Sequence, residues 1–295
     1  MPAIPSEFEE KEFEGPLYNQ LEHGTRLVWP PGQVFEQYVG FDRALFLSDP
    51  RLWGVFGVSS IPPGVFFHRF RPYFWPERPT RKIPTFRMNL FIQSKRSYFY
   101  RRLPKQIRGK LTGSTCWQFK IDESQQEALG RVARKLARRA FVCYAAPAFH
   151  KMSELTAHTS RGSILKNSTF PQAARLDGHE AFYYCSPGGS GVANPNPEEI
   201  EGPGLEDLLG NVVSGTDSSA QESVTGQLVA LANDIEATIA EEVPDTNPRK
   251  ALFTHRRNEL LALLEDFEQA GESARAFMRV RAFVSAFNLD WYAVV

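Results

Sequence analysis

The chain has 295 residues and no formal net charge, and with 42% hydrophobic and 23% charged residues it has the composition of a globular protein with one large domain or two modest ones. Residues 1–15 are acidic and interrupted by prolines, and no stretch approaches the roughly 20 consecutive apolar residues of a membrane helix, so we expect a cytoplasmic protein without a membrane segment. Three cysteines, Cys116, Cys143 and Cys185, lack the CxxC spacing of a zinc cluster and are expected to be free thiols.

The first predicted elements are a short helix and a strand. The helix covers residues 34–39, follows a Pro-Pro-Gly sequence and carries Glu36. The apolar run that begins at Phe41 predicts a strand that ends at Asp49-Pro50. Asp42 is the only acid near the start of this strand.

Residues 50–87 are rich in Pro, Gly and aromatic residues and are predicted to be an insertion. Residues 51–110 contain 14 Lys or Arg and one acid, whereas residues 196–245 contain 12 Asp or Glu and no base. Cations interleaved with flat rings suit a nucleic-acid strand, because the cations neutralise phosphates and the rings stack on bases. A solvated basic surface over an aromatic core is the other interpretation. The predicted nucleic-acid-binding residues are Arg69, Arg71, Arg96, Arg101, Arg102 and Lys105.

Three further strands and a long helix follow the insertion. Strands are predicted at Met88–Lys95, Cys116–Ile121 and Ala140–Ala145. Apolar residues at three- and four-residue steps predict a helix over Glu123–Arg139. The order helix, strand, strand, strand, helix, strand is typical of an α/β fold.

The C-terminal third is predicted to be helical. Glycine, proline and asparagine dominate residues 187–203, which predicts a long loop and a domain boundary. Two helical stripes of apolar residues follow. A third helix of this region is predicted at Ser273–Phe287. We therefore expect an α/β domain over residues 1–195, with the insertion at 50–87, and an acidic helical region over residues 196–295. These helices would offer a surface for a homo-oligomer or a protein partner.

Four polar residues form the candidate site: Glu36, Asp42, Gln93 and Lys95. Side chains alternate along a strand, so Gln93 and Lys95 point to the same face. A buried strand rarely carries an acid, an amide and an ammonium group unless they satisfy one another or bind something. The alternative is a structural ion pair between Lys95 and Asp42, with Glu36 as an ordinary surface acid.

This arrangement resembles the PD-(D/E)XK, or restriction-endonuclease-like, nuclease superfamily, in the variant where the second acid is replaced to give QxK. Gly40-Phe41-Asp42 and Gln93-Ser94-Lys95 are similar to the GxD and QxK elements of Mrr-like restriction endonucleases. Phe41 stands where the PD motif has proline, and the insertion lengthens the separation of the two elements. The resemblance covers residues 17–146 and implies a mixed central sheet flanked by helices, with the C-terminal helical region outside it.

For these side chains, the resemblance implies a Mg²⁺-dependent nuclease, with Mn²⁺ as a substitute. Mg²⁺ prefers carboxylates, water and phosphate oxygens, and its implied ligands are Asp42, Glu36 and Gln93. Lys95 would orient or deprotonate the attacking water and stabilise negative charge on the phosphate. The expected substrate is DNA, with RNA as the alternative, and the family analogy implies bacterial restriction or anti-phage defence.

A second function belongs to a different class: a catalytically inactive nuclease-fold protein that binds nucleic acid or a protein partner as a subunit of a larger complex. The basic aromatic insertion would then hold a nucleic-acid strand, and the C-terminal helices would hold the partner. The distance between Asp42 and Lys95 distinguishes the two functions, because side chains more than about 8 Å apart are too far apart to share a metal ion and its waters.

Overall fold

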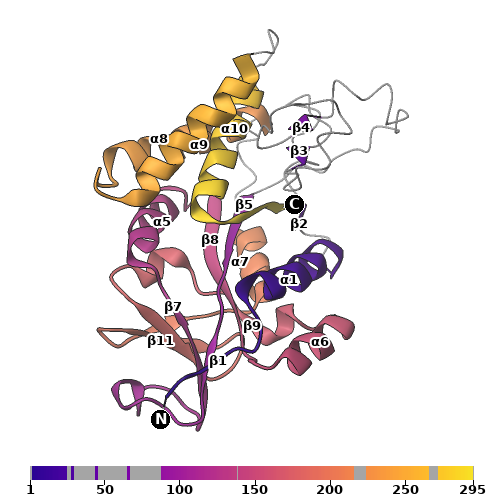
Figure 1. The fold of residues 1–295 in the computed structure, drawn as a ribbon, viewed down its shortest axis with the longest axis vertical. Helices are drawn as coiled ribbons and strands as arrows, with labels where there is room; N and C mark the ends of the chain where they lie inside the picture. The colour runs from indigo at the N-terminus through magenta and orange to yellow at the C-terminus, as the bar shows by residue number, and fades with distance from the viewer. Residues whose placement is uncertain are drawn as a thin grey trace.

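A mixed five-stranded sheet forms the centre of the computed structural model (Figure 1). The structure describes residues 2–24, 28–29, 44–45, 65–66, 88–137, 139–215, 224–265 and 272–294. The sheet has the order β2 (Val28–Trp29), β13 (Asp290–Val294), β5 (Met88–Ser94), β8 (Ala140–Pro147) and β9 (Ser168–Thr169). Strands β5 and β8 are parallel, whereas β13 is antiparallel to β5.

A second sheet has six strands, and all of its pairings are antiparallel. Its order is β1 (Ile4–Pro5), β6 (Tyr98–Tyr100), β7 (Cys116–Lys120), β10 (Ala181–Tyr184), β11 (Ser190–Asn194) and β12 (Glu198–Glu201). Only three residues separate β5 from β6, so the chain passes directly from one sheet to the other. Strands β3 (Ala44–Leu45) and β4 (Val65–Phe66) pair with each other in a separate two-stranded sheet.

Helices cover both faces of the five-stranded sheet. The helices are α1 (Glu10–Gly24), α5 (Glu123–Lys135), α6 (Met152–Ser160), α7 (Leu205–Gly215), α8 (Val224–Glu241), α9 (Pro248–Glu265) and α10 (Glu272–Phe287). One hydrophobic cluster joins Phe91 of β5 to α5, α8, α9 and α10. A second cluster joins Leu90 and Ile92 to α1, α6 and α7. Strand β5 is apolar on both faces because it is buried between these two layers.

The predicted strands and helices between residues 88 and 145 are confirmed, and so is the last helix. The prediction of a long loop over residues 187–203 is wrong, because β11 and β12 form a hairpin there. Gly191 belongs to this hairpin for packing reasons: a Cβ at this position would lie 2.2 Å from the Phe182 ring. Glycine therefore marks close packing between strands here, and not a loop.

The C-terminal segment also contains a strand that the sequence did not predict. Strand β13 follows α10 and pairs with β5 along residues 290–294. The ring centroids of Trp291 and Phe91 lie 5.9 Å apart, and Trp291 Nε1 donates a hydrogen bond to Asn89 Oδ1 at 2.9 Å. Strand β13 therefore anchors the helical region to the α/β core. Among the described residues, no helix combines the length and the apolar character that a bilayer crossing needs.

Candidate functional site

The carboxyl end of β5 carries Gln93 and Lys95, the two residues of the predicted catalytic set that the structure describes. Four predicted site residues lie outside the described residues: Glu36, Asp42, Arg69 and Arg71. The distance between Asp42 and Lys95 therefore stays a prediction. Both edges of β5 are occupied, by β13 and β8, whereas β3 pairs with β4. Strand β3 is a part of the strand that was predicted to begin at Phe41. This part of the predicted strand therefore does not pair with β5.

Gln93 is buried beside the end of α10, and only 2% of its surface is exposed. Its Nε2 donates to the backbone oxygen of Phe287 at 3.3 Å, and Gln125 Nε2 on α5 donates to the same oxygen at 2.5 Å. Gln93 Oε1 has no hydrogen-bond partner within the described part of the chain. Buried polar atoms are nearly always hydrogen-bonded, so this oxygen is an acceptor that a ligand could satisfy.

Lys95 lies two residues further along and points to the same side of the sheet as Gln93. Its Nζ lies 5.4 Å from the centre of the Tyr144 ring, which belongs to the core cluster of Phe91. Among the described residues, Lys95 has no ion pair. Burial lowers the pKa of Lys95, and the nearby carboxylates of Glu10 and Asp122 oppose this shift. The site thus has a partly buried ammonium group that forms no ion pair with a carboxylate of the described residues.

Two carboxylates that were not predicted as site residues act on Lys95. Glu10 lies in the first turn of α1, near Lys95 and the backbone N–H of Arg96. Burial raises the pKa of Glu10, and Lys95 partly opposes that shift. Asp122 is the N-cap of α5 and accepts from the backbone N–H of Gln125 at 2.8 Å. A hydrogen bond from Ser124 lowers the pKa of Asp122.

Asp290 lies on the opposite face of the sheet from Lys95. It pairs with Ile92 across β13 and β5, so its side chain shares the face of Ile92. The Tyr18 Oη of α1 lies 2.8 Å from Ser94 Oγ, and burial and the nearby Asp290 carboxylate raise the pKa of Tyr18 well above its usual range. Burial raises the pKa of Asp290. This carboxyl group therefore serves the packing of α1 and does not join Lys95.

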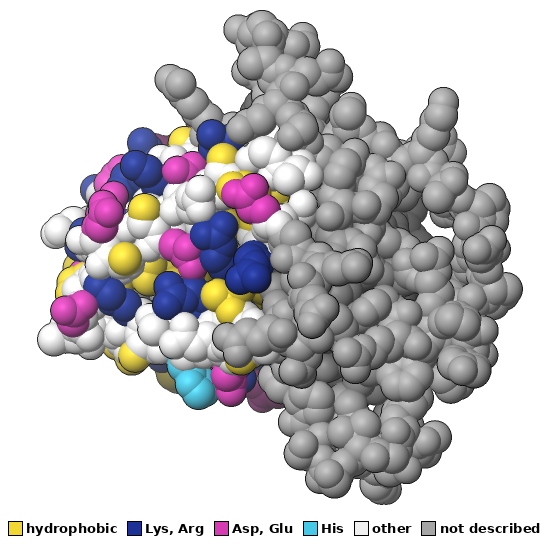
Figure 2. Space-filling view, turned by 90° about the horizontal axis from the view of Figure 1, so that it is seen from above, with side chains coloured by type: hydrophobic (Ala, Val, Ile, Leu, Met, Phe, Trp, Pro, Cys, Tyr) yellow, Lys and Arg dark blue, Asp and Glu magenta, His cyan; other side chains and the backbone are white. Residues whose placement is uncertain are grey.

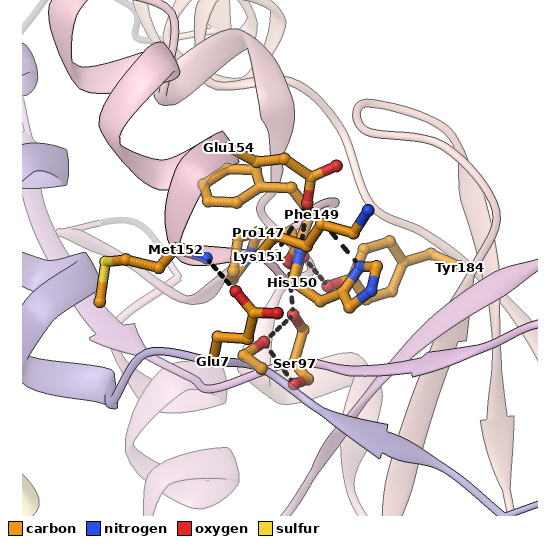
Figure 3. A network of polar contacts seen from close by, with 10 residues as sticks. Glu7, Ser97, Pro147, Phe149, His150, Lys151, Met152, Glu154 and Tyr184 are labelled. Atoms are coloured by element: carbon orange, nitrogen blue, oxygen red, sulfur yellow. Dashed lines mark hydrogen bonds and ion pairs between the residues drawn. The ribbon is translucent and has the colours of Figure 1, made fainter.

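The N-terminal segment is fastened beside the site by a network of polar contacts (Figure 3). Ser6 Oγ donates to the backbone oxygen of Ser97 at 2.7 Å, and Ser97 Oγ donates to the backbone oxygen of Phe149 at 3.0 Å. The carboxylate of Glu7 accepts from the backbone N–H of Met152, at the start of α6, at 2.9 Å. These contacts hold residues 6–7 in place and thereby fix the start of α1, where Glu10 lies.

Arg96 takes part in the same attachment. Its Nη1 lies 2.9 Å from the Glu9 carboxylate, and its Nη2 donates to the backbone oxygen of Ser6 at 2.5 Å. Arg96 was predicted to bind nucleic acid, but its guanidinium group already has protein partners. The predicted residues Arg101, Arg102 and Lys105 are exposed.

The C-terminal region carries basic as well as acidic side chains. The excess of acid ends at Asp245, and α9 carries Arg256 and Arg257. Figure 2 shows Lys and Arg side chains gathered on the face that is seen from above. In the helical region, Arg256 lies 2.9 Å from Glu259 and Arg279 lies 2.7 Å from Glu236, so these two cations are neutralised locally.

The described residues do not by themselves form a magnesium site. Among them, no group of three or more His, Cys, Asp or Glu is placed to hold a metal ion. The unpartnered Oε1 of Gln93 is the kind of oxygen that Mg²⁺ accepts, and Glu10 adds a carboxylate near Lys95. A complete set of ligands would need Asp42 or Glu36, which were predicted from the sequence.

Comparison of the chain with protein-family models, with curated proteins and with solved structures finds no match. The candidate site is therefore defined by the geometry of β5 and its neighbours.

Proposed function

We propose that the chain is a nuclease of the restriction-endonuclease-like type that hydrolyses nucleic-acid phosphodiester bonds at the carboxyl end of β5. The observation that carries this proposal is the placement of Gln93 and Lys95 on one face of a buried strand, where the amide oxygen has no partner and the ammonium group has no ion pair among the described residues. Support for the fold comes from α5, which lies in sequence between the parallel strands β5 and β8.

Lys95 would provide the main catalytic group. An ammonium group in a site with little water stabilises the negative charge that develops on a phosphate in the transition state. Its lowered pKa also increases the fraction of neutral amine, which can accept a proton from the attacking water. The Glu10 carboxylate and Gln93 Oε1 would orient that water as hydrogen-bond acceptors.

Mg²⁺ or Mn²⁺ belongs to the proposal because of the predicted ligands Asp42, Glu36 and Gln93. A bound metal ion would supply Lewis-acid chemistry at the phosphate. DNA is the proposed substrate and RNA the alternative, and bacterial defence is the proposed biological setting.

The proposal is tested by cleavage assays on the wild type, Lys95→Ala and Lys135→Ala. Lys135 is an exposed lysine of α5, so its variant controls for the loss of one positive charge. Substrates are plasmid, linear and single-stranded DNA and RNA, each with Mg²⁺, with Mn²⁺ and with chelator. We expect metal-dependent cleavage that falls by about 10²-fold or more in Lys95→Ala, as for other groups that stabilise transition-state charge.

Each variant is also examined by thermal unfolding, so that a loss of activity is separated from a loss of structure. Equal cleavage by a folded Lys95→Ala protein and the wild type would overturn the assignment of Lys95. Cleavage that persists in chelator would overturn the metal requirement.

A second candidate function is binding of nucleic acid without cleavage. It is favoured by the exposed cations Arg101, Arg102 and Lys105, which suit binding of a polyanion without any metal ion. It predicts that the wild type binds nucleic acid and cleaves none of the substrates under any of the metal conditions.

A further inference from the structure

A basic loop follows β6 and lies on the outer face of the six-stranded sheet. We define the basic loop as residues 101–110, and its exposed cations are Arg101, Arg102, Lys105, Arg108 and Lys110. No acid occurs between Arg96 and Ile121, so this part of the surface has a single sign of charge.

No carboxylate in the described part of the chain neutralises the cations of the basic loop. Within the ranges that the structure describes, none of the five forms an ion pair, and Lys110 donates only to the backbone oxygen of Pro197 at 2.9 Å. By contrast, Arg256 of α9 pairs with Glu259, and Arg257 of α9 and Arg279 of α10 pair with Glu236. Unpaired cations on one loop attract a polyanion, and the binding releases its counterions.

The backbone of the loop is anchored to the six-stranded sheet by Ile107 and by a hydrogen-bonded turn. Ile107 is fully buried and packs with Tyr183 and Val192 of the sheet. The 3₁₀ turn Lys105–Ile107 is closed by a hydrogen bond from Ile107 N to Pro104 O at 3.2 Å. A preorganised surface loses less conformational entropy on binding than a mobile one.

Strand β6 connects the basic loop to the candidate site. Lys95 and Arg101 are six residues apart, so at most roughly 20 Å of extended chain separates them. Between them, Lys120 of β7 lies with its Nζ 5.2 Å from the centre of the Tyr98 ring. A span of about 20 Å corresponds to roughly six base pairs of a duplex.

We propose that the basic loop is a second nucleic-acid-binding surface, which binds backbone phosphates within about half a helical turn of the scissile bond. The arginine guanidinium groups match phosphate geometry and carry no base-reading function here, so binding is independent of sequence. This inference rests on the proposed function only in taking nucleic acid as the ligand, because binding at the loop requires neither a metal ion nor Lys95.

The test is fluorescence anisotropy in chelator with labelled single-stranded DNA, duplex DNA and RNA. The proteins are the wild type, a triple variant Arg101→Gln/Arg102→Gln/Lys105→Gln, and Lys95→Ala. The matched control is Arg131→Gln/Arg134→Gln/Lys135→Gln on α5, which removes the same charge from residues that include ion pairs with Glu127 and Asp177. Affinities are measured over a series of KCl concentrations.

We expect the loop variant to bind at least about tenfold more weakly. The slope of log K against log salt should become shallower by about 2 to 3 for duplex DNA, because three phosphate contacts are lost. The α5 control should bind like the wild type, whereas Lys95→Ala, which removes one cation of the candidate site instead of three of the loop, should weaken binding less than the loop variant does. Equal affinity and equal slope for the loop variant and the wild type would overturn the inference.

The two proposals fail in different ways. Loop-dependent binding without any cleavage would leave the inference standing and remove the nuclease function. Cleavage together with binding that does not depend on the loop would support the nuclease function and overturn the inference about the loop. Loss of binding in the α5 control to the same extent as in the loop variant would indicate general charge attraction and would also overturn the inference.

Discussion

Gln93 combines two properties that rarely occur together, deep burial and an acceptor oxygen that has no hydrogen-bond partner among the described residues. Its removal is therefore expected to cost the fold little. In Gln93→Met, one hydrogen bond to Phe287 O is lost, but that oxygen still accepts from Gln125. The variant also removes a buried unsatisfied atom, a feature that costs about 1–3 kcal/mol.

We predict that Gln93→Met unfolds at the same or a higher urea concentration than the wild type, while its cleavage activity falls. Equilibrium urea unfolding and the cleavage assay measure the two effects separately. A destabilisation by several kcal/mol, well beyond the roughly 1 kcal/mol of one hydrogen bond, would instead assign Gln93 a structural role.

Glu10 gives the site a pH dependence whose sign follows from its raised pKa. A group with a raised pKa in the folded state stabilises that state below its unfolded pKa, and this contribution is lost as the pH rises through the folded pKa. Glu10→Gln lacks this titration and keeps the size of the side chain and one acceptor oxygen. Its stability relative to the wild type should therefore increase as the pH rises from 4 through the raised pKa.

The measurement is urea unfolding of the wild type and Glu10→Gln at several pH values between about 4 and 7, around the ordinary range of a glutamate pKa. Glu123→Gln, at an exposed position in the first turn of α5, controls for the change in net charge. Parallel stability curves for the wild type and Glu10→Gln would show that Glu10 is not perturbed in the fold.

Sequence reasoning could place Gln93 and Lys95 on one face, because alternation along a strand is a local property. Glu10 reaches the same site through tertiary packing, and its position in α1 depends on contacts that Ser6 and Glu7 make with distant segments. No local pattern encodes such contacts. The role of Asp122 could be predicted in part, because an aspartate just before a predicted helix is a recognisable N-cap.

Strand β13 is the element that makes the helical region part of the sheet. Trp291 is the main contact, with its ring against Phe91 and its Nε1 on Asn89. We predict that Trp291→Ala destabilises the protein by about 3–5 kcal/mol, as for other buried tryptophans. Trp291→Phe should cost much less, because it keeps a ring against Phe91. Thermal and urea unfolding give both values.

A loss below about 1 kcal/mol in Trp291→Ala, as for an average surface substitution, would mean that β13 is only loosely attached to β5.

At the scale of elements, long periodic segments were predictable and short ones were not. Helix α10 has a continuous apolar pattern and was predicted almost to the residue. Strand β13 has only five residues after that helix, and β12 has four, which is too short for alternation to stand out. The helix α1 was hidden by Pro16 inside it and by the acids of residues 7–14.

At the scale of the whole molecule, the charge composition of the sequence changes near residue 195, but the hydrophobic core continues across this position. The cluster that contains Phe91 and Phe119 also contains residues of α8, α9 and α10, and the ring centroids of Phe91 and Phe283 lie 5.5 Å apart. The charge pattern of a sequence reports its surface, whereas the core depends on which apolar faces meet. A boundary read from charge therefore need not separate two cores.

The position of β13 also has a consequence for synthesis. The hydrogen bond between Trp291 and Asn89 joins residues 202 positions apart. At about 5–20 residues per second, the ribosome needs roughly 10–40 s to make the intervening chain. During this time one edge of β5, with its row of apolar residues, has no β13 to pair with, and unpaired edges of this kind are prone to aggregate. A nascent chain would thus benefit from a chaperone that covers β5 until its partner strand emerges.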